Sequence, residues 1–564
     1  MTAWKIEGYP LHYPQRMNNG RNMSVYLDVR KSTPMAIGQY YRCCRTLIAS
    51  LLALSLVCAS AQAGQIHALV IGIDAYRAQG GELSDLQGAV NDARDIAAAL
   101  TEIGAAQVQV LLNEAAHRDA IFTHWQRLKA NAQPGDTLLL TYAGHGAQEP
   151  ERTPRSESDG MDEVTVLGGF RTSAPHNYQR IFDYEWRDLV TQAQDYNVIL
   201  VFDACHSGTM NRSLGRGRSR FGSYGAIERD PLPPPPPIND TRPAVLSHEV
   251  YVGATRDDMV VHEILMDGQH RGALSYTFAR ALRGAADTNG DGVVTRGELS
   301  RFIDTHVRQL AEHTQYPAVL FAGSPEAPLF PVQQSCPTHA QSSVRPQLPV
   351  ALEALPLTEQ ASLLARLSHI QAVAAAQAEL IWNPQQGAVH SQHGDQVASL
   401  PRDPQAAIPA LQNVIDKWRT LPALYTLTEC RQALQLSLLE GSGLHRAGHE
   451  VNLVIAPRTE PYLTLINLPS TGLTQWLYPR TEYGDVAYTA PQQPFTLNFV
   501  VTPPFGGDHL IALASRHPPQ ALHQALAQLE GRASAPQVFA ELQNLLRREP
   551  GQHELGILSF YTAP

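Results

Sequence analysis

The sequence has few cysteines, little charge and no stretch that resembles a basic nucleic-acid footprint. It holds 6 cysteines among 564 residues, and a chain of this length can bury large cores without disulfide bonds. Charged residues make up 17% of the chain and the formal net charge is -10, so nucleic acid is not an expected partner. The hydrophobic fraction, 43%, is that of a globular protein. At roughly 150 residues per domain, this length predicts two to four domains.

Long hydrophobic runs are also lacking. The apolar run near the start, residues 46–59, is short for a membrane span. Arg42 and Arg45 precede it, and Ala61-Gln62-Ala63 follows it with the small residues that a signal peptidase requires. The pattern predicts a secretory signal cleaved before Gly64, and hence a secreted or periplasmic protein without a stable membrane span. The alternative is a membrane anchor that stays uncleaved.

Cleavage of this signal would leave an odd number of cysteines. The three that remain are Cys205, Cys336 and Cys430. In an exported protein an odd count leaves at least one free thiol, which favours a reactive role for it. The apolar run lies far from the first residue, and Met35 lies at a more usual distance upstream, so we interpret residues 1–34 as a mis-assigned start.

Strands and helices are expected to alternate through the first half of the chain. Short apolar runs predict strands at 66–74, 107–112, 136–142, 197–203 and 249–254. Helical spacing predicts helices at 86–100, 117–130, 183–194, 273–283 and 297–313. The alternation predicts an α/β fold with a parallel sheet covered by helices on both faces. Residues 211–237, rich in Arg, Gly and Ser and then in Pro, are expected to form an exposed loop.

The second half of the chain changes in composition. Ala-, Leu- and Gln-rich stretches at 356–382 and 406–440 have a helical period, and short runs with Gly and Pro breaks after residue 449 predict a small β-rich domain. The chain is therefore divided into an N-terminal extension with the signal (1–63), an α/β domain (64–335), a linker (336–350), a helical region (351–445) and a β-rich C-terminal domain (446–564).

Two of the predicted strands end in residues with catalytic chemistry. The strand at 136–142 runs into His145, and the strand at 197–203 runs into Cys205, each with glycine nearby. If these strands are neighbours, both side chains face one cleft at the carboxyl edge of the sheet. A thiolate can attack a carbonyl carbon, and a histidine can take up the thiol proton and protonate the leaving amine. The backbone N–H groups of Gly146 and Cys205 are the expected oxyanion donors. The alternative is a packed core cysteine and a histidine with ordinary hydrogen bonds.

Residues 66–335 resemble the caspase-like cysteine peptidases, most of all the metacaspase and bacterial caspase-homologue branch. The resemblance rests on HALVIGIDAY, LQGAVNDA, YAGHG, DACHSG and the segment around GALSYTFARAL, and it covers about half of the chain. It implies a caspase-like, parallel-rich sheet sandwiched by helices, and a thiol protease with Cys205 as nucleophile and His145 as its partner. The caspase signature Gln-Ala-Cys-x-Gly is absent, because Asp203 stands where that pattern has Gln.

The same resemblance bears on the substrate. In metacaspase-like enzymes two acidic residues line the S1 pocket, and Asp92 and Asp203 stand at the matching positions. Two carboxylates favour Arg or Lys at P1 through charge-assisted hydrogen bonds, although Asp92 could also be a first-turn residue stabilised by the helix dipole. We expect a cysteine endopeptidase that cuts protein or peptide substrates after Arg or Lys. Self-cleavage is expected at 212–229, after one of Arg212, Arg216, Arg218, Arg220 or Arg229. The alternatives are an inactive caspase-like scaffold and a calcium-dependent binding protein whose C-terminal domain recognises a partner.

Two segments bear on calcium, and no organic cofactor is expected. Some metacaspases bind a regulatory calcium through an Asp cluster that Asp162 and Asp183 match, but Tyr184 and Arg212 replace further carboxylates, so that site is not expected here. Residues 287–298 fit the calcium-loop pattern D-x-[DN]-x-[DN]-G-x5-E in full. The expected ligands are Asp287, Asn289, Asp291, the carbonyl of Val293, Thr295 and Glu298. The alternative is a polar turn between two helices.

Overall fold

The structure is a computed structural model that describes most of the chain after residue 63. The described residues are 64–77, 80–153, 160–205, 219–232, 245–255, 261–266, 269–311, 315–332, 343–392, 394–428, 434–441, 444–456, 458–480 and 487–564. The expected signal at 46–59 and the cysteines Cys336 and Cys430 lie outside them. Within the described ranges, no helix is both long and apolar enough to cross a membrane.

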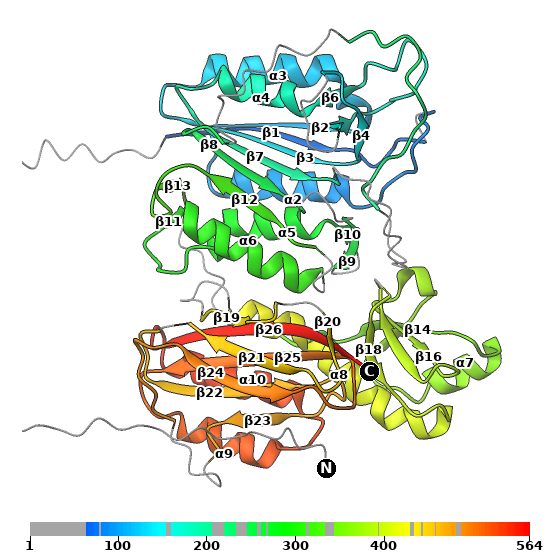
Figure 1. The fold of residues 1–564 in the computed structure, drawn as a ribbon, viewed down its shortest axis with the longest axis vertical. Coiled ribbons are helices and arrows are strands. Elements are labelled where there is room, and N and C mark those ends of the chain that lie inside the picture. Colours follow the sequence, from blue (N-terminus) through cyan, green and yellow to red (C-terminus); the bar gives the residue numbers. More distant parts are fainter. Residues whose placement is uncertain are drawn as a thin grey trace, which may run out of the picture. The chain divides into compact units, whose positions relative to one another are not determined.

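A six-stranded sheet forms the centre of the N-terminal half (Figure 1). Its order is β12-β8-β7-β3-β1-β2. The strands are β1 (Ile66–Gly72), β2 (Gln107–Leu112), β3 (Thr137–Ala143), β7 (Asn197–Asp203), β8 (Glu249–Gly253) and β12 (Ala318–Phe321). Of these six strands, β1, β2, β3, β7 and β8 pair in parallel. The sixth, β12, pairs antiparallel with β8. Every residue of β1 and β3 is buried, which explains why these strands are continuous apolar runs.

Helices cover both faces of this sheet (Figure 1). On one face lie α2 (Ala89–Glu102), α5 (Ala273–Arg280) and α6 (Arg296–Leu310), and on the other lie α3 (Arg118–Asn131) and α4 (Asp183–Thr191). Side chains alternate along β1, so that Ala68 and Val70 belong to the first core and Leu69 and Ile71 to the second. This arrangement confirms the predicted α/β fold, and the strands at 107–112 and 197–203 have the predicted bounds.

Several short strands that the sequence pattern did not reveal lie outside the main sheet. A three-stranded sheet contains β4 (Gly146–Pro150), β5 (Met161–Val166) and β6 (Arg180–Phe182). Two hairpin-like pairs contain β9 (Ile264–Met266) with β10 (Gln269–Arg271), and β11 (Val293–Thr295) with β13 (Pro328–Pro331). Most of these strands have only three to five residues, which is too few to give a clear period of two.

The region expected to be helical is mixed. Helix α7 (Leu357–Leu364) and helix α8 (Pro404–Leu427) are present, but residues 370–399, part of which was expected to be helical, contain strands. They join a sheet of order β15-β14-β16-β17-β18, made of β14 (Leu348–Leu352), β15 (Ile370–Ala372), β16 (Leu380–Asn383), β17 (Ala388–Ser391) and β18 (Gln396–Ser399). The Ala- and Gln-rich composition favours a helix, but burial of Trp382 and Val389 between neighbouring strands outweighs that propensity.

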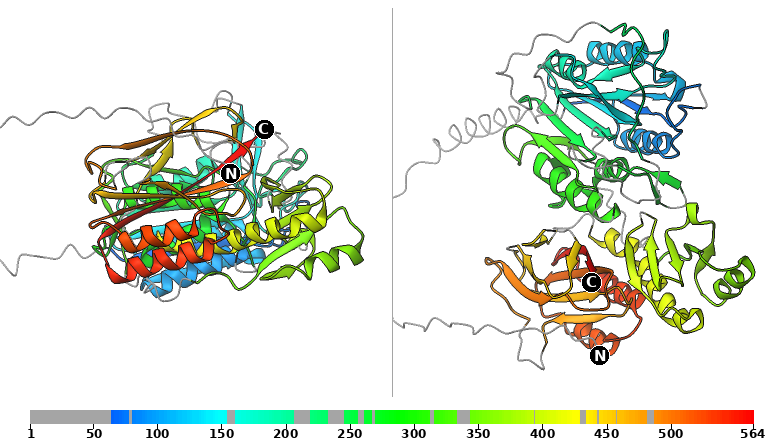
Figure 2. Two further views of the ribbon diagram at one scale, coloured as in Figure 1. Left: turned by 90° about the horizontal axis from the view of Figure 1, so that it is seen from below. Right: turned by 45° about the vertical axis from the view of Figure 1, so that its right-hand side comes forward.

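The C-terminal domain is β-rich, as predicted, and has three layers (Figure 2). Its middle layer is a sheet of order β20-β26-β25-β22-β23, made of β20 (Leu444–Arg446), β22 (Tyr462–Leu468), β23 (Gln475–Tyr478), β25 (Gly507–Ser515) and β26 (His553–Ala563). One of its faces packs on β19 (Leu436–Leu438), β21 (Glu450–Ile455) and β24 (Phe495–Val500). The other packs on α8, α9 (Gln520–Leu529) and α10 (Ala535–Arg548). The sequence pattern does not predict helices α9 and α10.

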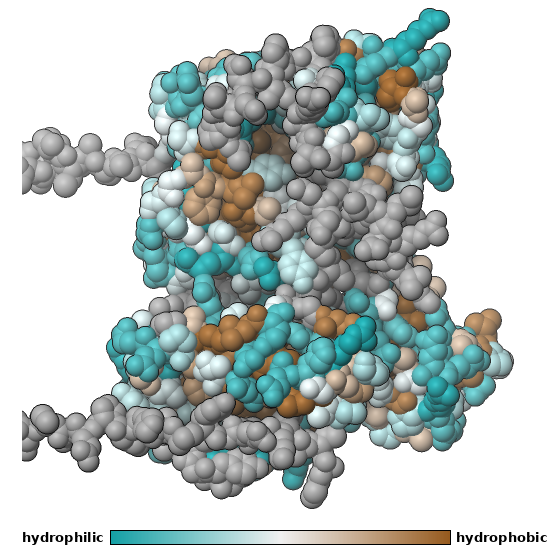
Figure 3. Space-filling view, viewed as in Figure 1, coloured by the Kyte–Doolittle hydropathy of each residue, from teal (hydrophilic) through white to brown (hydrophobic). Residues whose placement is uncertain are grey.

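One face of the described residues has a mixed surface. On the face shown in Figure 3, hydrophobic residues lie in small groups among hydrophilic ones.

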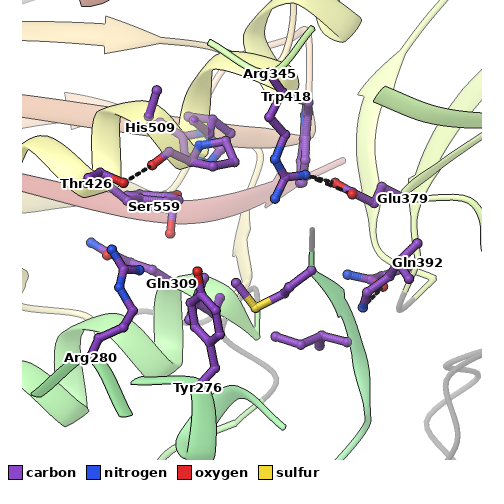
Figure 4. Close-up of a pocket in the computed structure, with 18 of the residues that line it drawn as sticks. Tyr276, Arg280, Gln309, Arg345, Glu379, Gln392, Trp418, Thr426, His509 and Ser559 are labelled. Carbon is purple, nitrogen blue, oxygen red and sulfur yellow. Dashed lines mark hydrogen bonds and ion pairs between the residues drawn. The ribbon is translucent and has the colours of Figure 1, made fainter. Parts of the chain in front are cut away.

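A cavity of about 320 Å³ is lined by side chains that include Tyr276, Arg280 and Gln309 of α5 and α6, and Trp418 of α8 (Figure 4). Neither His145 nor Cys205 lines this cavity, so it is separate from the candidate active site.

Candidate active site

The two candidate catalytic residues follow neighbouring strands. Ala143 at the end of β3 lies opposite Asp203 at the end of β7. His145 and Cys205 each come two residues after this pair, at the carboxyl edge of the sheet. A Cβ atom built on Gly146 would come within 1.9 Å of the carbonyl oxygen of Cys205. Glycine at position 146 is therefore required for the two loops to approach this closely.

His145 is held in one orientation by backbone and aromatic contacts. Its Nε2 lies 2.8 Å from the carbonyl oxygen of Ser84, so Nε2 carries the hydrogen and donates it. Its ring centroid lies 4.6 Å from that of Tyr76. Nδ1 is buried and makes no hydrogen bond within the described residues, which leaves it able to accept a proton. Burial lowers the pKa of His145, while the carbonyls of Ser84 and Arg220 raise it, so the imidazole is neutral at neutral pH.

Cys205 is a buried thiol in this structure. Its Sγ accepts a hydrogen bond from the N–H of Val261 at 2.8 Å, and its side chain is fully buried. Burial raises the pKa of Cys205 to about 12, and the N–H of Val261 opposes this shift only in part. The side chain is thus a neutral thiol at neutral pH.

Asp92 and Asp203 lie in one pocket beside these residues. Both are fully buried, Asp92 on α2 and Asp203 at the end of β7. The N–H of Gly272 donates to Asp92 at 2.9 Å and the N–H of Ser275 donates to Asp203 at 2.8 Å, so the start of α5 faces both carboxylates. A Cβ built on Gly272 would come within 2.1 Å of Oδ2 of Asp203. The segment GALS of the sequence therefore forms a wall of this pocket.

The protein's own Arg220 fills the pocket. Its Nη2 lies 2.5 Å from Oδ2 of Asp92, and its Nη1 lies 3.0 Å from Oδ1 of Asp203. A third carboxylate, Glu263, lies 3.5 Å from Nη2, and all four side chains are fully buried. Burial alone would lower the pKa of Arg220, but the three carboxylates outweigh it and raise that pKa. Burial raises the pKa of Asp92 well above its usual value, Arg220 opposes this, and the charge of Asp203 adds to it.

The backbone of Arg220 binds in the manner of a peptide substrate. Its N–H donates to the carbonyl of Val261 at 2.9 Å, and Ser219 forms an antiparallel bridge with His262. Its carbonyl oxygen accepts a hydrogen bond from the N–H of Gly146 at 3.0 Å. Extended peptides commonly bind by adding a strand to an exposed edge in this way. The carbonyl oxygen of the bond between Arg220 and Phe221 thus contacts Gly146, one of the two expected oxyanion donors.

Sequence reasoning missed several of these groups. Glu263 lies 60 residues from Asp203 in the sequence and next to a three-residue strand, so no motif marks it. Ser84 and Val261 contribute backbone atoms, which leave no signature in the side-chain pattern. Of the five arginines expected at the cleavage site, Arg220 is in the pocket and Arg229 is exposed, whereas Arg212, Arg216 and Arg218 lie outside the described residues.

The predicted calcium loop folds as a compact turn between α5 and α6. Asp287 accepts hydrogen bonds from the N–H groups of Gly290 and Gly292 at 2.8 and 2.9 Å. Glu298 caps α6 by accepting from the N–H of Thr295, and it also accepts from Thr288. Asn289, Asp291 and Val293 lie between these residues, joined by hydrogen bonds from Asp291 N–H to Asn289 and from Val293 N–H to Asp291. In the described part of the chain, no three His, Cys, Asp or Glu side chains are gathered as a metal site. Calcium binding by this loop stays a prediction.

An arginine lies beside Asp162, one of the two aspartates expected to match a regulatory calcium cluster. The N–H of Arg152 donates to Asp162 at 2.9 Å, and its guanidinium donates to the Tyr184 hydroxyl at 2.9 Å. Burial raises the pKa of Asp183 to about 6, the N–H of Tyr184 opposes this, and the charge of Asp162 adds to it. The position of Arg212 lies outside the described residues.

The α/β domain matches known peptidases. Residues 67–213 match the family model described as "Metacaspase, peptidase C14 domain". Metacaspase-1A of Neurospora crassa is 33% identical over 158 residues, which are 26% of this chain and 33% of that protein. Metacaspase-1 of Saccharomyces cerevisiae is also 33% identical over 158 residues, 26% of this chain and 34% of that protein. The chain thus spans about a third of the length of these curated relatives.

Similar solved structures have low sequence identity. A crystal structure of a Geobacter sulfurreducens protein is 22% identical and covers 48% of this chain and 100% of its own, with a TM-score of 0.36. Caspase-1 from Spodoptera frugiperda is 12% identical and covers 48% of this chain and 92% of its own, with a TM-score of 0.30.

Proposed function

We propose that the α/β domain is a caspase-like cysteine endopeptidase that cuts after Arg or Lys by means of Cys205 and His145. The observation that supports this most is Arg220, whose side chain contacts three buried carboxylates while its carbonyl oxygen contacts Gly146. A pocket with this charge favours a cation at P1 by charge-assisted hydrogen bonds. A scaffold without activity has no need of the paired His145 and Cys205.

The reaction follows from these positions. Neutral His145 takes the proton of Cys205 through Nδ1, and Sγ attacks the P1 carbonyl carbon. The N–H groups of Gly146 and Cys205 stabilise the developing oxyanion. His145 then protonates the amine of P1′, which leaves, and a water molecule hydrolyses the thioester with His145 as general base. Ser84 keeps the hydrogen on Nε2 and so leaves Nδ1 free for this transfer.

We further propose that Arg220–Phe221 is the first bond that the enzyme cuts. The test is mass spectrometry of purified protein, in which fragments ending at Arg220 and beginning at Phe221 should accumulate in wild type and be missing from Cys205→Ala. Cleavage of a peptide library by the same protein should show Arg or Lys at P1. Unchanged fragments in Cys205→Ala would contradict the proposal.

Export remains part of this proposal. It rests on the signal pattern at residues 46–63, and a free thiol nucleophile is compatible with an exported protein that has an odd number of cysteines. N-terminal sequencing of the protein from its native host should give a start at or near Gly64. A start at Met1 or Met35 would contradict it.

A further inference from the structure

The residues that follow the scissile bond are bound to the enzyme by many contacts that do not involve Arg220. The N–H of Gly222 donates to the carbonyl of Gly146 at 2.7 Å, and Phe221 packs against the core that contains α2 and α5. The hydroxyl of Tyr224 donates to the buried Glu149 at 2.7 Å, and its ring lies 4.6 Å from that of Phe170. Phe221 and Gly222 therefore pair with Gly146, the first residue of β4, which directly follows His145.

The next residues continue this attachment. The carbonyl of Glu228 accepts from Asn177, and its N–H donates to Thr172 at 2.9 Å. Asp230 forms an ion pair of 2.8 Å with the buried Arg180. The segment 221–232 is thus held at both ends and in its middle, and cleavage of the bond before Phe221 removes none of these contacts.

We propose that, after self-cleavage, the new α-amino group of Phe221 stays at the active site and accepts acyl groups from the Cys205 thioester. This inference rests on the proposed function. An amine held at the site of the former peptide bond has a high effective concentration toward the thioester carbon, which lets it compete with water. The protein would then be an acyltransferase toward its own Phe221 as well as a hydrolase.

The chemistry balances without another reactant. An arginine ester reacts with Cys205, the alcohol leaves with the proton that His145 carried, and a thioester remains. The neutral amine of Phe221 attacks the thioester carbon, so that a C–N bond forms and the C–S bond breaks. The proton lost by the amine passes through His145 to the Cys205 sulfur. An α-amino group has a pKa of about 7.7–8.0 in an unperturbed peptide, so transfer should gain on hydrolysis as pH rises from about 6.5 to 8.5.

The experiment uses the self-cleaved full chain with Nα-acetyl-arginine ethyl ester as the donor. Ester loss measures total turnover, and mass spectrometry of the fragment that begins at Phe221 measures transfer of the acetyl-arginyl group. Wild type should carry this group on Phe221. Tyr224→Phe/Asp230→Asn, which weakens the attachment of 221–232, should lower the ratio of transfer to hydrolysis by about tenfold or more and leave ester hydrolysis intact.

The controls separate this inference from the proposed function. Arg229→Ala removes an exposed side chain of the same segment and should behave as wild type. Normal ester hydrolysis without acylation of Phe221 would overturn this inference but not the proposed function. The same holds if Phe221 is acylated but the ratio of transfer to hydrolysis is unchanged in Tyr224→Phe/Asp230→Asn. Ester hydrolysis by a chain that stays uncut at Arg220 would also overturn it. Loss of both ester hydrolysis and self-cleavage would instead overturn the proposed function.

Discussion

Replacement of Arg220 by alanine should both destabilise the protein and open its S1 pocket. The side chain is the cation that three buried carboxylates share, those of Asp92, Asp203 and Glu263. Without it, these groups keep their backbone hydrogen bonds but have no positive partner. The variant is best made in a Cys205→Ala background, which keeps the chain uncut and makes its stability comparable with that of the parent.

The size of the effect follows from the burial of the ion pairs. Removing one partner of a buried pair costs about 3–5 kcal/mol, and entry of water into the emptied pocket favours the lower end, about 3 kcal/mol. The α/β domain, residues 64–335, is at the large end of single domains, for which about 1 kcal/mol lowers Tm by about 2 °C, so the expected loss is about 6 °C. Burial already raises the pKa of Asp92, and loss of Arg220 removes the interaction that opposes this. A carboxyl group whose folded pKa is raised destabilises the protein increasingly as pH rises, so the loss should be larger at pH 8 than at pH 5.

The assay is thermal unfolding with and without benzamidine, a small amidinium ion. Benzamidine at about 100 times its Kd should restore about 2.7 kcal/mol to the Arg220→Ala variant, since it binds the folded state alone, and it should change the parent little because its pocket is full. Arg229→Ala is the matched control, because Arg229 is an exposed arginine of the same segment. An unchanged Tm in Arg220→Ala, with no response to benzamidine, would refute the placement of Arg220 in the pocket.

Three further expectations concern the site and the calcium loop. His145→Ala should remove self-cleavage and peptidase activity as completely as Cys205→Ala while the circular dichroism spectrum stays that of wild type; substantial activity in either variant would exclude the dyad. Asp92→Asn and Asp203→Asn should each lower kcat/KM for Arg substrates by about tenfold or more, because each removes a charge-assisted hydrogen bond, and a library preference for Asp at P1 would show that the pocket has another role. Calorimetric titration of metal-free protein should detect calcium binding that Asp287→Ala/Glu298→Ala abolishes; no heat at millimolar calcium would mean that the loop is only a turn.

The central strands of the main sheet, β1, β3 and β7, could be predicted because they are continuous apolar runs buried on both faces, whereas the edge strand β2 is only half-buried. The runs QVQVLL and NVILVFD coincide with β2 and β7, and the neighbouring positions of β3 and β7 bring the loops of His145 and Cys205 together. The strands of residues 370–399 could not be predicted in this way. Residues 370–382 have an Ala- and Gln-rich composition that favours a helix, and pairing with β14 and β17 makes them strands instead.

The pocket was predictable only in part for a related reason. Asp92 and Asp203 stand in recognisable family motifs. The position of Glu263 instead depends on where a short strand passes the start of α2, because the N–H groups of Gln87 and Gly88 donate hydrogen bonds to its carboxylate. The sequence named five arginines as equivalent cleavage sites. Arg220 is distinguished by the pairing of its neighbours, since Ser219 lies opposite His262 and Phe221 lies beside Gly146. Isolated pairings of this kind, outside regular strands, leave no pattern in the sequence.

The same contacts that present Arg220 as a substrate also restrain the nucleophile. With the segment in place, burial raises the pKa of Cys205 to about 12 and lowers that of His145, so both side chains are neutral. We therefore expect the proposed first cut to begin from a thiol and an imidazole, with proton transfer and attack occurring together, rather than from a preformed thiolate. Once Arg220 leaves the pocket, water reaches Sγ and the cause of the raised pKa weakens. If the proposed self-cleavage occurs, the first turnover, on the enzyme's own chain, should therefore be slower than later turnovers on a good arginine substrate, and the intact protein is expected to be a latent form of the enzyme.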